Sequence, residues 1–302
     1  MKVGEFMAKK PMKAPPPRGL DFLMRNEQGR WAEDLVIDTI NDTEKFSAVR
    51  YGLSRVVLVK GGREWSEYWE KYQKVEKYGK RPNVLIFKKD VYRSFESELN
   101  QLASEYGDPS LIPEDEWEKY VKRAVCALEV EMSLWKASKM PDKDMKLPLK
   151  KKDVVAPMIW VKEDDALRLK EWYNKYGKSI YIVQVFYDLA FIAPFLEIIK
   201  KAERILSEPN EKKKIELMKR EGLIVSKQKF VDERTSTAVS KVVYRLHPSA
   251  AKVFGILEEP PTIKVDVLED ERGKILPFLK FSGGILRINQ EILNEWEKLQ
   301  QS

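Results

Sequence analysis

Histidine and cysteine are almost absent from this chain of 302 residues, which has one of each, His247 and Cys126. A single cysteine excludes an intramolecular disulfide and a cysteine-rich zinc site, and a single histidine excludes a multi-histidine metal cluster. Any catalysis must therefore use carboxylates, lysines and a hard metal ion that prefers oxygen ligands. We expect His247, which precedes Pro248, to be a surface or capping residue.

Long apolar runs are missing as well. No segment approaches the ~20 consecutive apolar residues that a membrane-spanning helix needs, and no signal-peptide core follows the first residues. We therefore expect a cytoplasmic protein with no membrane partner. The length is sufficient to bury a full hydrophobic core, either as one large domain or as a core with an accessory lobe.

Positive charge is in modest excess. The 55 lysines and arginines outnumber the 48 aspartates and glutamates, which gives a net charge of +7. This balance favours a polyanionic partner, although a basic protein without such a partner would have the same composition.

The first 19 residues have the composition of an appendage. Glu5-Phe6 precedes a second methionine, Met7, and is what an in-frame cloning site could encode, so we expect a vector leader with a native start at Met7. Residues 8–19 are basic and proline-rich and cannot form a helix. They could follow a phosphate backbone or form a disordered tail.

Strands and helices alternate through the next segment, 20–207. Amphipathic periodicity predicts helices over 28–41, 65–78, 91–106, 114–124, 163–175 and 195–206, and one after Met132 that carries Lys136 and Lys139 up to Pro141. Apolar runs predict strands over 46–60 (interrupted near Gly52), 84–87, 126–131, 155–161 and 180–186. This order predicts an α/β fold, with a mixed central sheet flanked by helices.

The regular alternation of strands and helices ends near residue 208. A lysine-rich helix over 211–221 precedes strand-like segments at 223–231, 239–246, 262–268 and 275–288 and a final helix over 289–299. We interpret residues 208–302 as a basic α+β lobe that contacts DNA or forms a dimer interface. The lysines at 212–214 are by default a solvated helix face.

Two glutamates interrupt an apolar strand. Glu129 and Glu131 flank Val130, and burying an unpaired carboxylate costs several kcal/mol or more. A metal cation would compensate this charge, and a metal held by carboxylates can activate water and anchor a phosphate.

These strands resemble those of the PD-(D/E)XK nucleases, in which Pro-Asp opens one strand and Glu/Asp-x-Lys lies on the next. Here the corresponding residues are Pro82-Asn83 and Glu129-Val130-Glu131. The resemblance implies a restriction-endonuclease-like core with Mg²⁺ bound by Asn83, Glu129, the Val130 carbonyl and Glu33 of the first helix. Glu131 stands where the motif has lysine, so either Glu131 or Lys136 takes that role.

Asn83 departs from the motif. An amide oxygen lacks the charge of a carboxylate and binds Mg²⁺ more weakly, so the chain as written should be nearly inactive. Two explanations are open: an Asp→Asn substitution made to trap an uncleaved complex, or a natural protein that binds without cutting.

A narrower resemblance is to the AccI-type type II restriction endonucleases, over about residues 20–205. It implies a homodimer that cuts a palindromic double-stranded DNA site, with each subunit hydrolysing one strand. The alternative function is a non-catalytic duplex-binding protein on a degraded nuclease fold, while an RNA-processing nuclease lacks a recognisable RNA-binding motif. Gln184 could read adenine, but a strand position facing the back of the sheet is favoured. The resemblance rests on five segments: Trp31-Ala32-Glu33, Arg50-Tyr51-Gly52, Gly79-Lys80-Arg81-Pro82, Leu128-Glu129-Val130 and residues 180–188.

Overall fold

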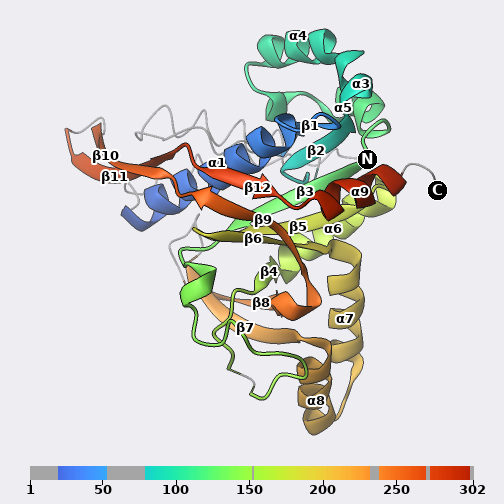
Figure 1. Ribbon diagram of the computed structural model, residues 1–302, viewed down its shortest axis with the longest axis vertical. Helices are drawn as coiled ribbons and strands as arrows, with labels where there is room; N and C mark the ends of the chain where they lie inside the picture. The colour runs from blue at the N-terminus through green and yellow to red at the C-terminus, as the bar shows by residue number, and fades with distance from the viewer. Residues whose placement is uncertain (1–19, 53–78, 152, 232–237, 270–272, 300–302) are drawn as a thin grey trace, which may run out of the picture.

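The computed structural model describes residues 20–52, 79–151, 153–231, 238–269 and 273–299. The predicted leader and arm, the helix over 65–78 and the second half of the strand predicted over 46–60 lie outside these residues. Within them, the fold is a mixed α/β structure built on a large curled sheet, as the sequence predicts (Figure 1).

The largest sheet of the described residues has seven strands in the order β1-β2-β3-β5-β6-β9-β12. β3 is antiparallel to β2 and parallel to β5, so the sheet is mixed. Its strands are β1 (Phe46–Arg50), β2 (Val84–Lys88), β3 (Cys126–Met132), β5 (Ile180–Val185), β6 (Leu189–Pro194), β9 (Lys252–Glu259) and β12 (Ile285–Ile288).

Hydrophobic cores cover both faces of this sheet. Because side chains alternate along a strand, Leu128 and Val130 of β3 face the core that contains helix α1 (Leu20–Asn41), whereas Ala127 faces the core beneath the other face. Glu129 alternates with Val130 and so shares the face of Ala127. α9 (Gln290–Lys298) joins the α1 side through buried Trp296.

Helices of the second core cover the opposite face. They are amphipathic, and their buried residues recur at helical spacing, as in Ala166, Leu169 and Trp172 of α6. This group comprises α4 (Glu96–Tyr106), α5 (Glu114–Val121), α6 (Glu163–Tyr176), α7 (Phe195–Ser207) and α8 (Glu211–Glu221), with the short α3 (Lys89–Arg93) at the end of β2.

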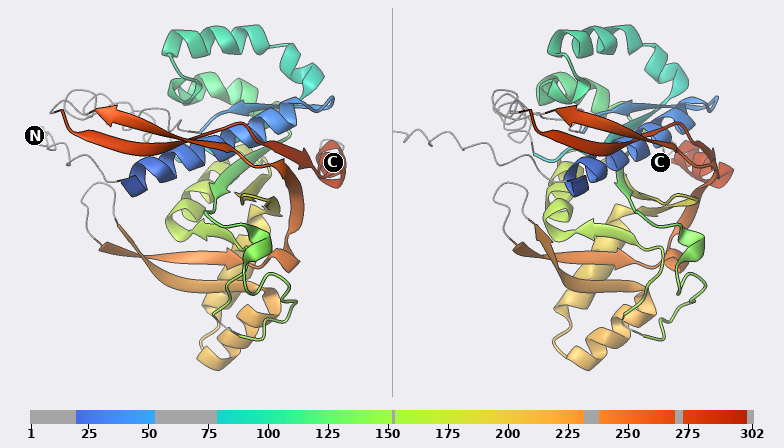
Figure 2. Two further views of the ribbon diagram at one scale, coloured as in Figure 1. Left: turned by 60° about the vertical axis from the view of Figure 1, so that its left-hand side comes forward. Right: turned by 90° about the vertical axis from the view of Figure 1, so that its left-hand side faces the viewer.

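Two smaller sheets complete the described structure. β4 (Ile159–Lys162), β8 (Ala238–Leu246) and β7 (Leu223–Val231) form a three-stranded sheet, and β10 (Thr262–Glu269) pairs with β11 (Ile275–Ser282) in a long hairpin. The hairpin and the β7–β8 ribbon project to the same side of the molecule (Figure 2).

Several elements differ from the prediction: the helix over 91–106 is divided into α3 and α4, and the strand over 275–288 into β11 and β12. No α-helix follows Met132: a short 3-10 turn, Ala137–Lys139, forms instead, because the Asp188 carboxylate accepts the backbone N–H groups of Ala137 and Ser138. The strand predicted over 155–161 is only β4, and it joins the smaller sheet. Two strands of the main sheet, β6 and β9, were not predicted; the apolar run of β6 leads directly into α7.

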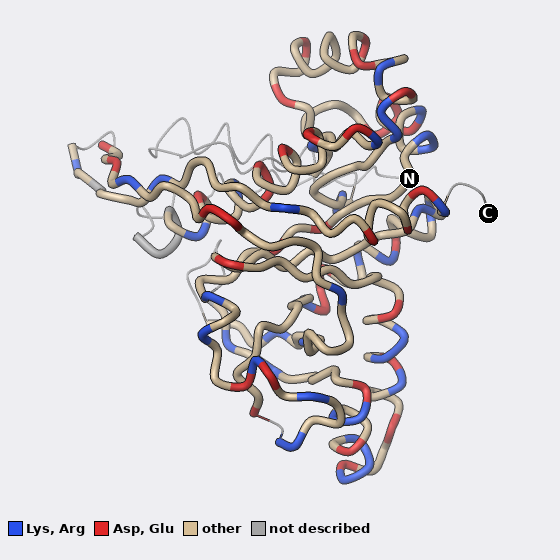
Figure 3. The backbone as a smooth tube through the Cα atoms, in the orientation of Figure 1, with Lys and Arg blue, Asp and Glu red and all other residues tan. Residues whose placement is uncertain are grey.

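The predicted division at residue 207 does not coincide with a break in the main sheet. β9, from the C-terminal segment, pairs with β6 and with β12. The separate roles proposed for residues 20–207 and 208–302 stay predictions. Figure 3 shows basic and acidic residues interspersed over both halves of the chain.

Candidate active site

Asn83 lies just before β2, beside the point where β3 runs past the last β2–β3 pair, Val84 with Leu128. Its side-chain Oδ1 accepts a hydrogen bond from the Val130 backbone N–H at 2.8 Å. Since the N–H and C=O of one strand residue point to the same edge, the Val130 carbonyl also faces this edge. The structure thus brings together two of the predicted site residues.

Gly52 holds the backbone of Asn83 in place. The N–H groups of Tyr51 and Gly52 donate to the Asn83 carbonyl at 2.9 and 3.0 Å. A Cβ at position 52 would lie 2.8 Å from the Pro82 carbonyl oxygen, so a side chain would displace this loop. The close approach gives a physical reason for glycine in the segment Arg50-Tyr51-Gly52.

Glu33 reaches the same point from α1. Its Oε1 accepts a hydrogen bond from Asn83 Nδ2 at 3.1 Å, and its Oε2 pairs with Arg50, which also contacts Asp34. Glu33 is buried, and it contacts residue 83 as the resemblance implied. A carboxylate at position 83 would place two acidic oxygens in contact, an arrangement that needs a cation or a proton between them.

Glu129 lies on the opposite face of β3 and contacts Lys80. The Lys80 Nζ is 2.5 Å from Glu129 Oε1 and 3.1 Å from Asp165 Oδ1 at the start of α6. Glu129 is only 4% exposed, and its second oxygen, Oε2, is buried with no hydrogen-bond partner. One half of this carboxylate is therefore uncompensated.

The electrostatics follow from this geometry. Burial raises the pKa of Glu129 to about 7; Lys80 opposes the rise, and the neighbouring Glu131 carboxylate adds to it. Burial alone would lower the pKa of Lys80, but Glu129 and Asp165 outweigh it and raise that pKa. The pKa of Asp165 is lowered, since Lys80 and Lys162 outweigh the effect of its burial.

Glu131 and Lys136 differ in placement. Glu131 shares the face of Glu129, is partly exposed and pairs in register with Gln184 of β5. Lys136 is exposed, and the helix on which its proposed role depended is not formed. Gln184 is buried and accepts a hydrogen bond from the Trp160 N–H. This placement agrees with the interpretation of Gln184 as a residue of the sheet interior rather than one that reads adenine.

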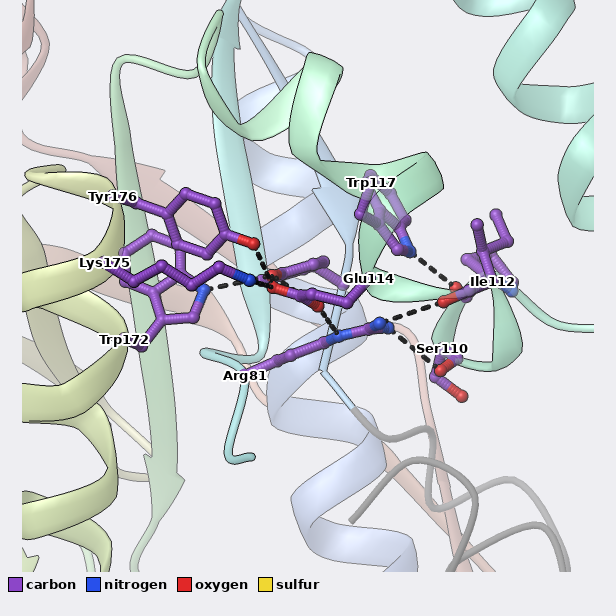
Figure 4. A network of polar contacts seen from close by, with 10 residues as sticks. Arg81, Ser110, Ile112, Glu114, Trp117, Trp172, Lys175 and Tyr176 are labelled. Atoms are coloured by element: carbon purple, nitrogen blue, oxygen red, sulfur yellow. Dashed lines mark hydrogen bonds and ion pairs between the residues drawn. The ribbon is translucent and has the colours of Figure 1, made fainter. Parts of the chain in front are cut away.

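A buried network that the sequence analysis missed anchors the segment before Asn83 (Figure 4). The Arg81 guanidinium donates to Glu114 at 2.6 Å and to the carbonyls of Ser110 and Ile112. Glu114 also accepts hydrogen bonds from the hydroxyls of Tyr51 and Tyr176. Because Arg81 is two residues from Asn83, this network fixes the loop that carries both Lys80 and Asn83.

His247 is fully buried, so the surface placement is wrong, whereas the capping role is confirmed. Its Nδ1 accepts the backbone N–H of Ser249 at 3.2 Å.

Comparison with known families assigns the chain. The model of the AccI restriction endonuclease family matches residues 3–156. The chain belongs to the AccI restriction endonuclease family. The matched segment includes Glu33, Lys80, Asn83, Glu129 and Glu131. No curated protein and no solved structure matches the chain.

Membership of the AccI family makes this a restriction-endonuclease-type chain, and therefore a nuclease with DNA as its partner. Among the helices that the structure describes, none is both long enough and apolar enough to cross a membrane.

Oxygen donors of the kind that a hard divalent cation prefers lie at the strand ends. The unpartnered Glu129 Oε2 is the clearest such donor, and the Val130 carbonyl at the edge of β3 is a second. Position 83 contributes only a neutral oxygen, and among the described residues no three acidic, histidine or cysteine side chains lie close enough to hold a metal. An aspartate at position 83 would add the missing charge.

Proposed function

We propose that this chain is a type II restriction endonuclease, a hydrolase that cleaves phosphodiester bonds at a specific site in double-stranded DNA with Mg²⁺ as its cofactor. The observation that carries the proposal is the buried, half-compensated Glu129, whose neighbour Val130 bonds to Asn83, within the segment that matches the AccI family. Perturbed, buried carboxylates of this kind concentrate at functional sites.

The proposed metal ligands are Glu129, the Val130 carbonyl, Glu33 and residue 83. When bound, the cation activates a water molecule and neutralises charge on the scissile phosphate. Asn83 orients the Val130 backbone and contacts Glu33, but it brings no negative charge. The chain as written should therefore cleave DNA very slowly.

Lys80 is the best candidate for the lysine that the Glu129-Val130-Glu131 segment lacks. Its ammonium group contacts Glu129, and its side chain is 21% exposed, so it can reach solvent and a phosphate. In this role Lys80 holds a positive charge next to the carboxylate and the phosphate oxygens, where charge develops in the transition state. Glu131, partly exposed on the same face, is placed to orient water.

A second function, duplex binding without cleavage, is favoured by one observation. Both ends of the Asn83 amide are hydrogen-bonded, to Val130 and to Glu33, so this site accommodates asparagine without an unsatisfied polar group. The proposed homodimer is compatible with either function.

Digestion by the Asn83→Asp protein separates the two functions. Each 1.4 kcal/mol of restored transition-state stabilisation gives tenfold in rate, so we expect Mg²⁺-dependent cleavage to rise by about a thousandfold, with discrete fragments from a sequenced plasmid. If the Asn83→Asp protein binds duplex DNA but cuts none with Mg²⁺ or Mn²⁺ at several temperatures, the endonuclease proposal is wrong.

A further inference from the structure

One face of the three-stranded β4–β8–β7 sheet carries basic and aromatic side chains around two buried apolar residues, Val243 and Ile224. The register pairs Trp160 with Arg245, and alternation along the strands places Lys162, Lys241 and Phe230 on the same side. The residues of the opposite face, such as Val161, Tyr244 and Leu246, belong to the hydrophobic core. We call the first set, Trp160, Lys162, Phe230, Lys241 and Arg245, the β4–β8 face.

Cations on the β4–β8 face stack on aromatic rings. The Arg245 guanidinium carbon lies 5.5 Å from the centre of the Trp160 ring, and the Lys162 Nζ lies 5.8 Å from that of Phe230. Trp160 is 37% exposed, although it is large and apolar. Such stacking holds a positive charge in a fixed position at the surface.

Arg245 differs from its two lysine neighbours. Lys162 and Lys241 are ion-paired with Asp165 and Asp164, at 3.9 and 2.9 Å. No described side chain forms an ion pair with Arg245, and its Nε is buried without an acceptor. Burial lowers the pKa of Arg245, and Asp153 only partly opposes this effect. The buried Nε cannot meet an anion from solvent, so a contact would be made by the two terminal guanidinium nitrogens, which are not among the buried atoms without a partner.

The β4–β8 face adjoins the candidate active site. The Trp160 N–H bonds to Gln184, which pairs in register with Glu131. Asp165 forms ion pairs with both Lys162 and Lys80, and Lys80 also contacts Glu129. A duplex whose scissile phosphate lies at Glu129 would thus have neighbouring phosphates near this face.

We infer that the β4–β8 face binds the phosphate backbone of duplex DNA, with the guanidinium of Arg245 as its principal phosphate contact. This inference rests on the proposed function and extends it to residues beyond 156, outside the part that matches the AccI family. Arginine offers several N–H donors in a fixed geometry that suits phosphate oxygens.

Binding of a fluorescein-labelled duplex of mixed sequence, measured by anisotropy without metal, tests the inference. Arg245→Met should raise Kd about tenfold and reduce the slope of log K against log salt by about one, since one phosphate contact is lost. Arg245→Lys should keep the slope. Arg220→Met, on the exposed surface of α8, is the matched control and should change neither quantity.

Lys162→Met offers a second variant in case Arg245→Met does not fold, because this lysine is 41% exposed. We expect it to weaken binding about threefold and to lower the salt slope. The inference is overturned if the unmodified chain binds the duplex and the folded Arg245 and Lys162 variants bind it with the same Kd and slope. Equal affinity for a single strand of the same length would also overturn it.

A cleavage assay distinguishes failure of the phosphate-binding inference from failure of the proposed endonuclease function. If the β4–β8 face is not involved, the Asn83→Asp protein still cleaves plasmid DNA with or without the Arg245→Met change. If the proposed function is wrong, the Asn83→Asp protein does not cleave at all.

Discussion

Two buried glutamates, Glu114 and Glu129, lie near the same loop, but their surroundings differ: Glu114 contacts two cations, Arg81 and Lys175, whereas Glu129 contacts only Lys80 among the described residues. Both carboxylates are almost inaccessible, with 8% and 6% of their side chains exposed. Glu114 accepts hydrogen bonds from Arg81, Tyr51 and Tyr176, which occupy both of its oxygens. Glu129 has Lys80 on one oxygen and no partner on the other.

The difference separates a structural carboxylate from a functional one. A fully bonded buried network stabilises one arrangement of the chain, here the loop from Lys80 to Asn83. An unsatisfied buried oxygen costs stability, so its retention calls for a role that folding does not provide. Glu114 thus fixes the loop, and the role proposed for Glu129 is to bind a cation from solution.

The largest expected effect is on catalysis. In the Asn83→Asp background, Glu129→Ala should lower Mg²⁺-dependent plasmid cleavage by about a thousandfold or more, because it removes a metal ligand. Duplex binding should change by less than about threefold, since phosphate and base contacts carry affinity. Glu118→Ala, on the exposed side of α5, is the control. Full activity of the Glu129→Ala protein would remove this residue from the mechanism.

For the free energy of unfolding, we expect Glu114 to matter more than Glu129. Glu114→Ala leaves the fully buried Arg81 side chain without its carboxylate and should cost about 3–5 kcal/mol in the free energy of unfolding. Glu129→Gln should cost less than about 1 kcal/mol, because Asp165 still pairs with Lys80 and one buried charge is removed. Urea denaturation of the metal-free proteins measures both, and equal losses would contradict the distinction between the two glutamates.

Lys80 should contribute less than Glu129. Lys80→Met in the Asn83→Asp background should lower kcat about 100-fold with little change in KM, since its charge acts mainly in the transition state. Lys80→Arg should recover part of the rate. Lys122→Met, a change of an exposed lysine, provides the comparison. An unchanged kcat for Lys80→Met would show that Lys80 does not take the place of the motif lysine.

Glu33 should give the smallest of these effects. Glu33→Gln in the same background should lower the cleavage rate about tenfold, because position 83 loses a charged neighbour while Asp34 still pairs with Arg50. Asp34→Asn changes the exposed member of the same ion-pair group and should leave the rate unaltered. If the two variants behave alike, Glu33 acts only through Arg50.

The sequence was sufficient to predict the elements with strong periodicity. Helix α8 has the predicted bounds, and the strands that carry Val84 and Glu129 form as expected, because apolar runs between polar turns determine them locally. The proximity of Glu33, Asn83 and Val130 was also predicted, through the family resemblance.

Long-range pairing was not predictable in the same way. The contact of Lys80 with Glu129 and that of Arg81 with Glu114 join segments 49 and 33 residues apart, and no periodicity encodes such distances. The pairing of β9, a strand that was not predicted, with β6 of the main sheet is long-range in the same way. The helix expected around Lys136 does not form because Asp188, 51 and 50 residues away, accepts the N–H groups of Ala137 and Ser138.

The most direct test of the central claim is a calorimetric titration of the Asn83→Asp protein with Mg²⁺, with Ca²⁺ as a second probe. The account predicts binding at the Glu129 site that is much weaker in the unmodified chain and lost when Glu129→Gln is added, while Glu118→Gln has no effect. Unchanged metal binding after Glu129→Gln, or none in the folded Asn83→Asp protein, would contradict the account.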